Sequence, residues 1–111
     1  MPEITVSKEA GVTLICVAGR IDSSNANELG EALTELIDSG NRSLVMDLSA
    51  VDYMSSAGLR ELVSALKRVK RDAGDLRIAQ PSKRVLDVMT LAGLNTIFTI
   101  YNTQAEALNS Y

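Results

Sequence analysis

The sequence predicts a single α/β domain, a mainly parallel mixed sheet with one antiparallel edge strand, in the order β-β-α-β-α-β-α-β-α. From residue 12 onward, short apolar segments alternate with longer segments of helical period, as in strands joined by crossover helices. The first two strand-like segments are separated by only a tight turn, which predicts a hairpin. The chain has 111 residues, enough for one domain and too few for two, so the domain is expected to span residues 1–111.

The predicted hairpin occupies the first 21 residues. Ile4 and Val6 alternate with polar residues, as in a half-buried strand. Residues 9–11 form a turn signal, and residues 12–21 are rich in β-branched and apolar side chains. The first strand is therefore expected at an edge of the sheet, antiparallel to the second.

A first helix is expected to follow this hairpin. Four successive polar residues offer alternative N-caps for it: Asp22, Ser23, Ser24 and Asn25. Apolar residues then recur at helical spacing from Ala26 to Ile37, and Gly40 is a typical C-terminal stop.

The middle of the chain predicts a strand, a turn and a second helix. Ser43–Leu48 is short and mostly apolar, as expected of a buried central strand. The residues from Ser49 to Ser55 are interpreted as a turn. An apolar stripe beginning at Leu59 then indicates a helix that ends near Gly74.

The last third predicts two further strands, each followed by a helix. Residues 76–79 form a short strand, and Ser82 can cap a helix that Gly93 ends. The apolar residues of that helix are Val85, Leu86 and Met89. The range 97–101 is the expected final strand, and Thr103 can cap a short helix that carries Ala107 and Leu108.

Residue usage excludes most catalytic and metal sites. The chain has no histidine and one cysteine, so a Ser-His-Asp triad, a Cys-His pair, a His-ligated metal and a cysteine zinc site are all impossible. Neither phosphate-binding glycine motif, GxxxxGK[ST] or GxGxxG, occurs. We therefore expect no cofactor and no enzymatic activity, with a carboxylate-driven hydrolase or a nucleotide-binding ATPase as the alternative. Cys16, inside a predicted strand, is expected to be an inert buried thiol.

Charge and hydropathy set limits on partners and location. The net charge of −3 argues against a nucleic-acid binder, and the basic residues Lys67, Lys70 and Arg71 are interpreted as a solvated helix face. No apolar run approaches the roughly 20 residues of a membrane span. Residues 1–6 lack the features of a secretory signal. These observations predict a cytoplasmic protein that does not insert into a membrane.

The segment 45–62 carries the main functional signal. Ser55 and Ser56 stand where the second helix begins, and Gly58 lies in its first turn, where helix propensity disfavours glycine. The missing side chain is expected to let another backbone or a protein surface approach. The free N–H groups of a helix N-terminus suit an anion such as a phosphate. An alternative is that both serines are ordinary caps.

Several segments, in order, resemble the STAS family, the anti-sigma factor antagonists of bacteria. The signature loop is matched by DLS at 47–49 and SSAGL at 55–59. GRID at 19–22, AGL at 92–94 and TQAEAL at 103–108 are similar to family segments elsewhere in the chain. The resemblance covers nearly the whole sequence. Many members have Asp in place of Ser55 and Ser or Thr in place of Ala57, a mild departure.

The resemblance implies a phosphorylation switch. It makes Ser56 the phosphoacceptor, with Ser55 as the rival. Family members bind a serine-kinase anti-sigma factor and so free a sigma factor; the kinase phosphorylates its antagonist, which dissociates, and a phosphoserine phosphatase restores the binding form. The chain is then expected to be monomeric when free. An alternative client is an ABC lipid-transport or sensor-scaffold complex, bound without phosphorylation.

Residues of the two loops at the carboxyl ends of the strands are expected to contact the partner. Met54 is considered as an adaptable apolar contact and alternatively as core, and Asp22 as a negative charge beside the acceptor and alternatively as a helix cap. The expected contact residues are Asp22, Ser23, Met54, Ser55, Ser56, Ala57, Gly58 and Leu59.

Overall fold

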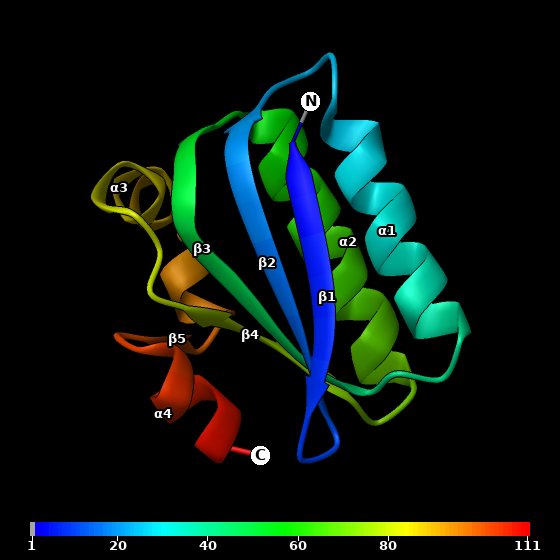
Figure 1. The fold of residues 1–111 in the computed structure, drawn as a ribbon. Helices are drawn as coiled ribbons and strands as arrows, with labels where there is room; N and C mark the ends of the chain where they lie inside the picture. The colour runs from blue at the N-terminus through cyan, green and yellow to red at the C-terminus, as the bar shows by residue number, and fades with distance from the viewer. Residues whose placement is uncertain (1) are drawn as a thin grey trace.

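Five strands form one mixed sheet in the spatial order β1-β2-β3-β4-β5, in a computed structural model that describes residues 2–111 (Figure 1). Two predictions include residue 1, the domain span 1–111 and the lack of a secretory signal in residues 1–6, and for that residue they lie outside the described part of the chain. The elements are β1 (Glu3–Glu9), β2 (Val12–Ile21), α1 (Ala26–Asp38), β3 (Ser43–Met54), α2 (Ser56–Arg71), β4 (Asp75–Ala79), α3 (Lys83–Leu91), the 3-10 helix η1 (Leu94–Thr96), β5 (Ile100–Tyr101) and α4 (Gln104–Asn109).

The sheet topology confirms the predicted α/β class. β1 pairs with β2 in antiparallel register, while β2–β3, β3–β4 and β4–β5 are parallel pairs. β1 is therefore the antiparallel strand at an edge, as the hairpin signal predicted. Helices α1 and α2 lie side by side over one face of the sheet, and α4 lies on the other (Figure 1).

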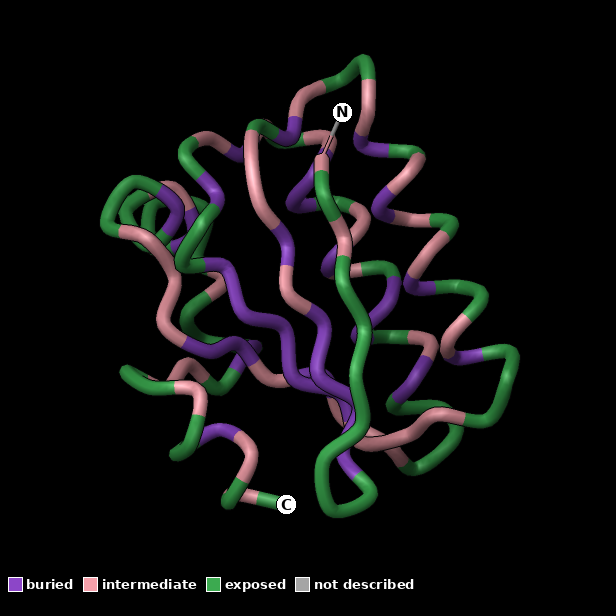
Figure 2. The backbone as a smooth tube through the Cα atoms, viewed as in Figure 1, coloured by how far each residue is buried: buried purple, intermediate pink, exposed green. Residues whose placement is uncertain are grey.

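One large apolar core fills the space between the sheet and helices α1 and α2. Figure 2 shows the buried residues along β2 and β3 and along the inward sides of these helices. Leu29, Leu33 and Ile37 of α1 are at most 1% exposed, which confirms the helical apolar spacing read from the sequence. A smaller core under α4 joins Leu14, Val45 and other residues of the opposite sheet face.

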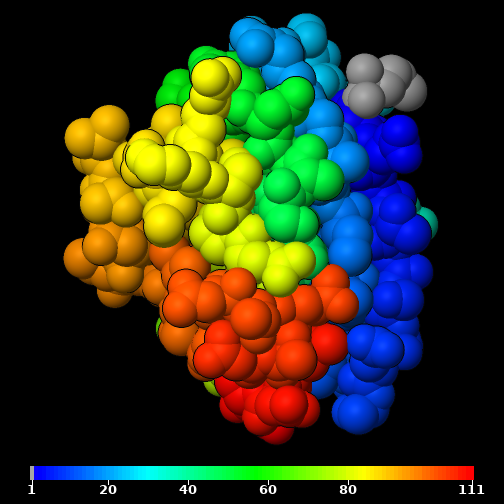
Figure 3. All heavy atoms as spheres, turned by 60° about the vertical axis from the view of Figure 1, so that its left-hand side comes forward, coloured from blue at the N-terminus to red at the C-terminus, as the bar shows by residue number. Residues whose placement is uncertain are grey.

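Strand β3 is longer than predicted. The range expected to be a turn, Ser49–Ser55, continues the strand as far as Met54 and pairs with the second half of β2. Its side chains are mixed because one face of the sheet is open there: Val51 is buried, whereas Asp52 is exposed. Two register shifts in the pairing with β2 obscure the simple alternation that would identify a strand. The exposed part of β3 (green) is visible beside β2 (blue) in Figure 3.

The last third differs from expectation in two places. The final strand is only Ile100–Tyr101, because the N–H groups of Ile97 and Phe98 donate to the Leu94 carbonyl at 3.1 Å and 2.9 Å and so continue the turn of η1. In α3 only Val85 and Met89 are buried, whereas Leu86, predicted to be on the apolar side, is 37% exposed. Helix α3 packs beside β3 through a single row of side chains. Two positions four residues apart lie in such a row, and these are the two residues that α3 buries.

Two predicted helix caps of this region are confirmed. The Ser82 hydroxyl accepts a hydrogen bond from the Val85 N–H at 3.4 Å. The Thr103 hydroxyl accepts one from the Glu106 N–H at 3.1 Å. Each side chain satisfies a backbone donor that the first helical turn leaves free.

Candidate functional site

The two predicted functional loops meet at one end of the molecule. Ile21 and Met54 are register partners at the ends of the parallel strands β2 and β3, and the Ser55 N–H donates to the Ile21 carbonyl at 2.9 Å. The β2–α1 connection and the start of α2 therefore lie together at the upper end of the sheet in Figure 1. This is the edge where loops of parallel sheets commonly bind ligands.

Ser55 and Ser56 occupy different positions at the start of α2. Ser55 is the N-cap residue, half-buried, and its hydroxyl accepts a hydrogen bond from the Gly58 N–H at 3.4 Å. Ser56 is the first helical residue and is exposed. Ser55 is thus engaged in capping, whereas Ser56 presents its side chain to solvent beside the positive end of the helix dipole.

Gly58 is required by packing inside the chain. A Cβ atom at this position would lie 2.7 Å from Cγ2 of Ile21 and 2.9 Å from Cγ of Met54. Both distances are shorter than carbon–carbon contact, so α2 can start this close to the sheet only with glycine. The groups that approach Gly58 are buried side chains of the same chain, which corrects the expectation of an outside surface.

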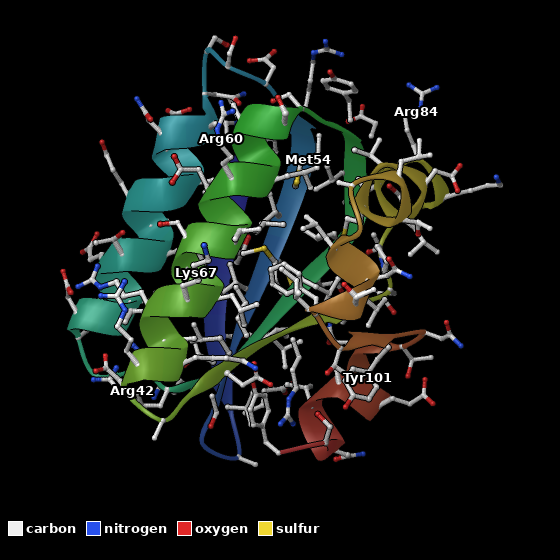
Figure 4. The ribbon with its side chains drawn as sticks, turned by 180° about the vertical axis from the view of Figure 1, so that it is seen from behind. Arg42, Met54, Arg60, Lys67, Arg84 and Tyr101 are labelled. Atoms are coloured by element: carbon white, nitrogen blue, oxygen red, sulfur yellow. The ribbon has the colours of Figure 1, made fainter. Side chains whose placement is uncertain are left out.

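The prediction of Met54 as a surface contact is wrong. Its side chain is 1% exposed because it points toward the helices from the end of β3, so it belongs to the core. Figure 4 shows Met54 beside the first turn of α2, on the side toward β3. Leu59 is 7% exposed and Ala57 is half-buried, both packed against the same core.

Asp22 shapes the β2–α1 loop. Its carboxylate accepts hydrogen bonds from the Ser24 hydroxyl and from the Ser24 N–H, the latter at 2.9 Å, while the Asp22 N–H donates to the Asn25 side chain at 2.9 Å. Asn25 holds the N-cap position of α1, so the alternative of Asp22 as the cap is wrong. The Ser24 hydroxyl first, then the Ser24 N–H and Arg20, hold the pKa of Asp22 below its usual value. Ser23 is exposed at the tip.

Arg20 joins the two loops and was missed by the sequence reasoning. Its guanidinium carbon lies 4.2 Å from the centroid of the Tyr53 ring, and its Nε lies 3.2 Å from the Asp22 carboxylate. The cation compensates part of the negative charge that Asp22 brings beside α2. The contact could not be predicted because residues 49–55 were interpreted as a turn. Only the pairing of β2 with the second half of β3 places Arg20 opposite Tyr53.

Asp47 lies in β3, on the side of the sheet that α4 covers, and its carboxylate connects three parts of the chain. It is 5% exposed and accepts hydrogen bonds from the Ser49 N–H at 2.9 Å and from the side-chain amides of Gln80 at 2.9 Å and Gln104 at 2.7 Å. One donor is a backbone N–H two residues away, and the other two are side-chain amides from distant parts of the chain. The carboxylate ties the middle of β3 to the residue that follows β4 and to α4.

Other groups offer little reactive chemistry. Cys16 is half-buried, less than predicted, and burial followed by the charge of Asp47 raises the pKa of its thiol. Within residues 2–111 there is no group of three or more acidic or cysteine side chains placed to hold a metal ion. None of the helices in that same range is long and apolar enough to cross a membrane.

Comparison with known proteins identifies relatives along almost the full chain. The family model of the STAS domain matches residues 3–107. BtrV of Bordetella bronchiseptica is 31% identical over 109 residues, covering 98% of this chain and 94% of that protein. The anti-sigma-F factor antagonist RsfB of Mycobacterium tuberculosis is 30% identical over 107 residues, covering 95% and 85%. The crystal structure of an anti-sigma factor antagonist from Mycobacterium paratuberculosis has a TM-score of 0.91 at 27% identity, covering 99% and 93%.

Proposed function

Because the chain belongs to the STAS domain family, we propose that it is an anti-sigma factor antagonist whose binding is switched by phosphorylation of Ser56. The unphosphorylated form binds a serine-kinase anti-sigma factor and releases the sigma factor that this kinase holds. Phosphorylation ends the binding, and a phosphoserine phosphatase restores it. The chain is cytoplasmic and monomeric when no partner is bound, is a substrate of both enzymes, binds no nucleic acid and catalyses no reaction itself.

The exposed position of Ser56 at the start of α2 carries this proposal. The kinase transfers the terminal phosphoryl group of a nucleoside triphosphate to the Ser56 oxygen, releasing the nucleoside diphosphate and the hydroxyl proton. Hydrolysis by the phosphatase releases inorganic phosphate. A phosphoserine carries about −1.5 to −2 charges at neutral pH, and a helix N-terminus stabilises such an anion. The fold therefore tolerates the modification, and its effect falls on the partner.

The rival acceptor, Ser55, is less suited to phosphorylation. Its hydroxyl caps α2 by accepting from the Gly58 N–H, and its side chain is half-buried between the two loops. Modification there would remove the cap and place a dianion against the end of β2. Ser56 is accessible to an enzyme, and its phosphorylation leaves the Ser55 cap of α2 in place.

Capture from host extract tests the proposal. Wild-type protein, Ser56→Asp and the matched control Ser7→Asp, an exposed site on β1, serve as baits, and bound proteins are identified by mass spectrometry. We expect wild type and Ser7→Asp to retain a small serine kinase that Ser56→Asp loses. Retention of the kinase by Ser56→Asp would contradict the switch. Capture of membrane-transport or scaffold subunits in its place would assign the alternative client.

Phosphosite mapping separates the two serines. The baits are incubated in extract with ATP, and the peptide that contains both residues is sequenced by mass spectrometry. We expect phosphate on Ser56, its loss in Ser56→Ala, and its retention in Ser55→Ala. Phosphate on Ser55 of the wild type would reverse the assignment.

A further inference from the structure

A groove runs along the outer side of α2 from Ser56 toward the middle of the helix. Its cavity volume is about 670 Å³, and its apolar lining comes from Leu59 and Val63 of α2 and from Ala92 and Leu94 on the opposite wall. We call it the α2–η1 groove. Because Ser56 itself lines one end, anything bound in this groove lies against the proposed phosphorylation site.

The rim of the groove on α2 is positively charged. Arg60 and Lys67 line it, and both are exposed (Figure 4). Within residues 2–111 neither forms a salt bridge, whereas Arg68 on the other side of α2 pairs with Asp38 of α1. The one acidic residue of the lining, Glu61, lies over Gly30 of α1, so its carboxylate is turned away from the groove. Arg60 and Lys67 can therefore pair with acidic side chains of a partner.

Further apolar surface flanks the opposite wall. Leu91, directly before Ala92, is 89% exposed, and Ile97, directly after η1, is 45% exposed. Large apolar side chains this exposed, beside an apolar groove and next to cations, are typical of a protein-binding surface.

We propose that the α2–η1 groove binds an acidic amphipathic segment of the anti-sigma partner, and that phosphate on Ser56 repels that segment. The inference rests on the proposed function and adds the chemistry of what is bound. Apolar side chains of the segment contact Leu59, Val63 and Leu94, and its carboxylates pair with Arg60 and Lys67.

The phosphate acts on this groove in two ways. It places a dianion at the end where an acidic segment would enter, and like charges repel strongly at a desolvated contact. Arg60 is four residues after Ser56, a spacing that brings two side chains together on one face of a helix. The phosphate therefore also takes one of the two cations that would hold the segment.

The acidic helix α1 of a second copy does not fit as the occupant. Helix α1 supplies an acidic surface, with Glu28, Glu31 and Glu35 outside the core. Its apolar residues Leu29 and Leu33 are at most 1% exposed, so it has no free apolar side to insert.

Titration with designed peptides tests the chemistry directly. The probe is a short helical peptide with leucines along one side and glutamates along the other, and its match carries lysines in place of glutamates. In spectra of isotope-labelled protein we expect the acidic peptide alone to shift the amide signals of residues that line the groove. Lys67→Glu should weaken its binding roughly tenfold, Ser56→Asp should weaken it as well, and the distant reversal Lys8→Glu should have no effect.

The outcomes separate this inference from the proposed function. Unshifted groove amides, equal binding of the two peptides, or an equal effect of Lys8→Glu would overturn the groove assignment. In capture from extract, equal retention of the kinase by Lys67→Glu and by wild type would also overturn the groove assignment. The proposed function would stand in that case. Self-association of the protein that Lys67→Glu abolishes would assign the groove to a second copy. Peptide binding in the groove without any captured kinase would contradict the proposed function alone.

Discussion

Replacing Asp47 by asparagine should destabilise the fold by about 2–4 kcal/mol although the side-chain shape is unchanged. One carboxylate oxygen accepts from the Ser49 N–H, and the other accepts from both Gln80 and Gln104. Asparagine has one acceptor oxygen and one NH₂ group, so in either orientation the NH₂ faces a donor. Hydrogen bonds to a charged group contribute about 1.5–3 kcal/mol each and neutral ones about 0.5–1.5. With its oxygen toward the two glutamines, asparagine weakens two bonds by about 1 kcal/mol each and leaves the Ser49 N–H without an acceptor, so the loss is at least about 2 kcal/mol. Rotation of the glutamine amides or a small shift of the Ser49 backbone relieves part of the donor–donor contact and limits the loss to about 4 kcal/mol.

The assay is urea unfolding followed by far-ultraviolet circular dichroism, which suits a chain without tryptophan. The matched control is Ser49→Ala, which keeps the backbone donor and loses only an exposed hydroxyl 3.4 Å from the Gln80 amide. It should change the free energy of unfolding by less than about 0.5 kcal/mol. A loss below about 1 kcal/mol in Asp47→Asn would refute the argument that this carboxylate holds β3, β4 and α4 together.

Three further substitutions test other parts of the structure. Gly58→Ala should lower the free energy of unfolding by about 1 kcal/mol, because overpacking outweighs the gain in helix propensity. The exposed control Ser64→Ala should raise the free energy of unfolding slightly. A Gly58→Ala variant more stable than wild type would contradict the packing argument. Ser55→Ala should cost about 0.5–1 kcal/mol in thermal unfolding through loss of the cap, and no loss would mean that its 3.4 Å hydrogen bond contributes nothing. Burial raises the pKa of Tyr111 to about 12 from 10.0, so its neutral phenol stabilises the fold below pH 10 and that contribution is lost as pH rises through 12. Tyr111→Phe should lack this alkaline component in unfolding measured against pH, and an unchanged pH dependence would exclude it.

The order and type of the elements were determined by the sequence, for local physical reasons. Apolar residues at helical spacing, the caps Ser82 and Thr103 and the stop at Gly93 all act within one or two turns of the chain. Such signals do not depend on what packs against the segment, so they can be read without a structure. The position of Ser56 at the start of a helix was predicted on the same basis, and the family resemblance pointed to the same residue.

Features that depend on pairing between distant segments were decided only by the tertiary structure. The strand from Ser49 to Met54 exists because β2 lies beside it, with register shifts that the polarity pattern conceals. Met54 is the register partner of Ile21 in that pair, and Gly58 of α2 packs against the side chains of both.

The Arg20–Tyr53 contact, the donors around Asp47 and the α2–η1 groove also join residues far apart in the chain. A sequence shows that such residues are charged, polar or apolar. Which of them meet is determined by the packing of the sheet and helices, and that packing placed an apolar groove with a basic rim beside Ser56.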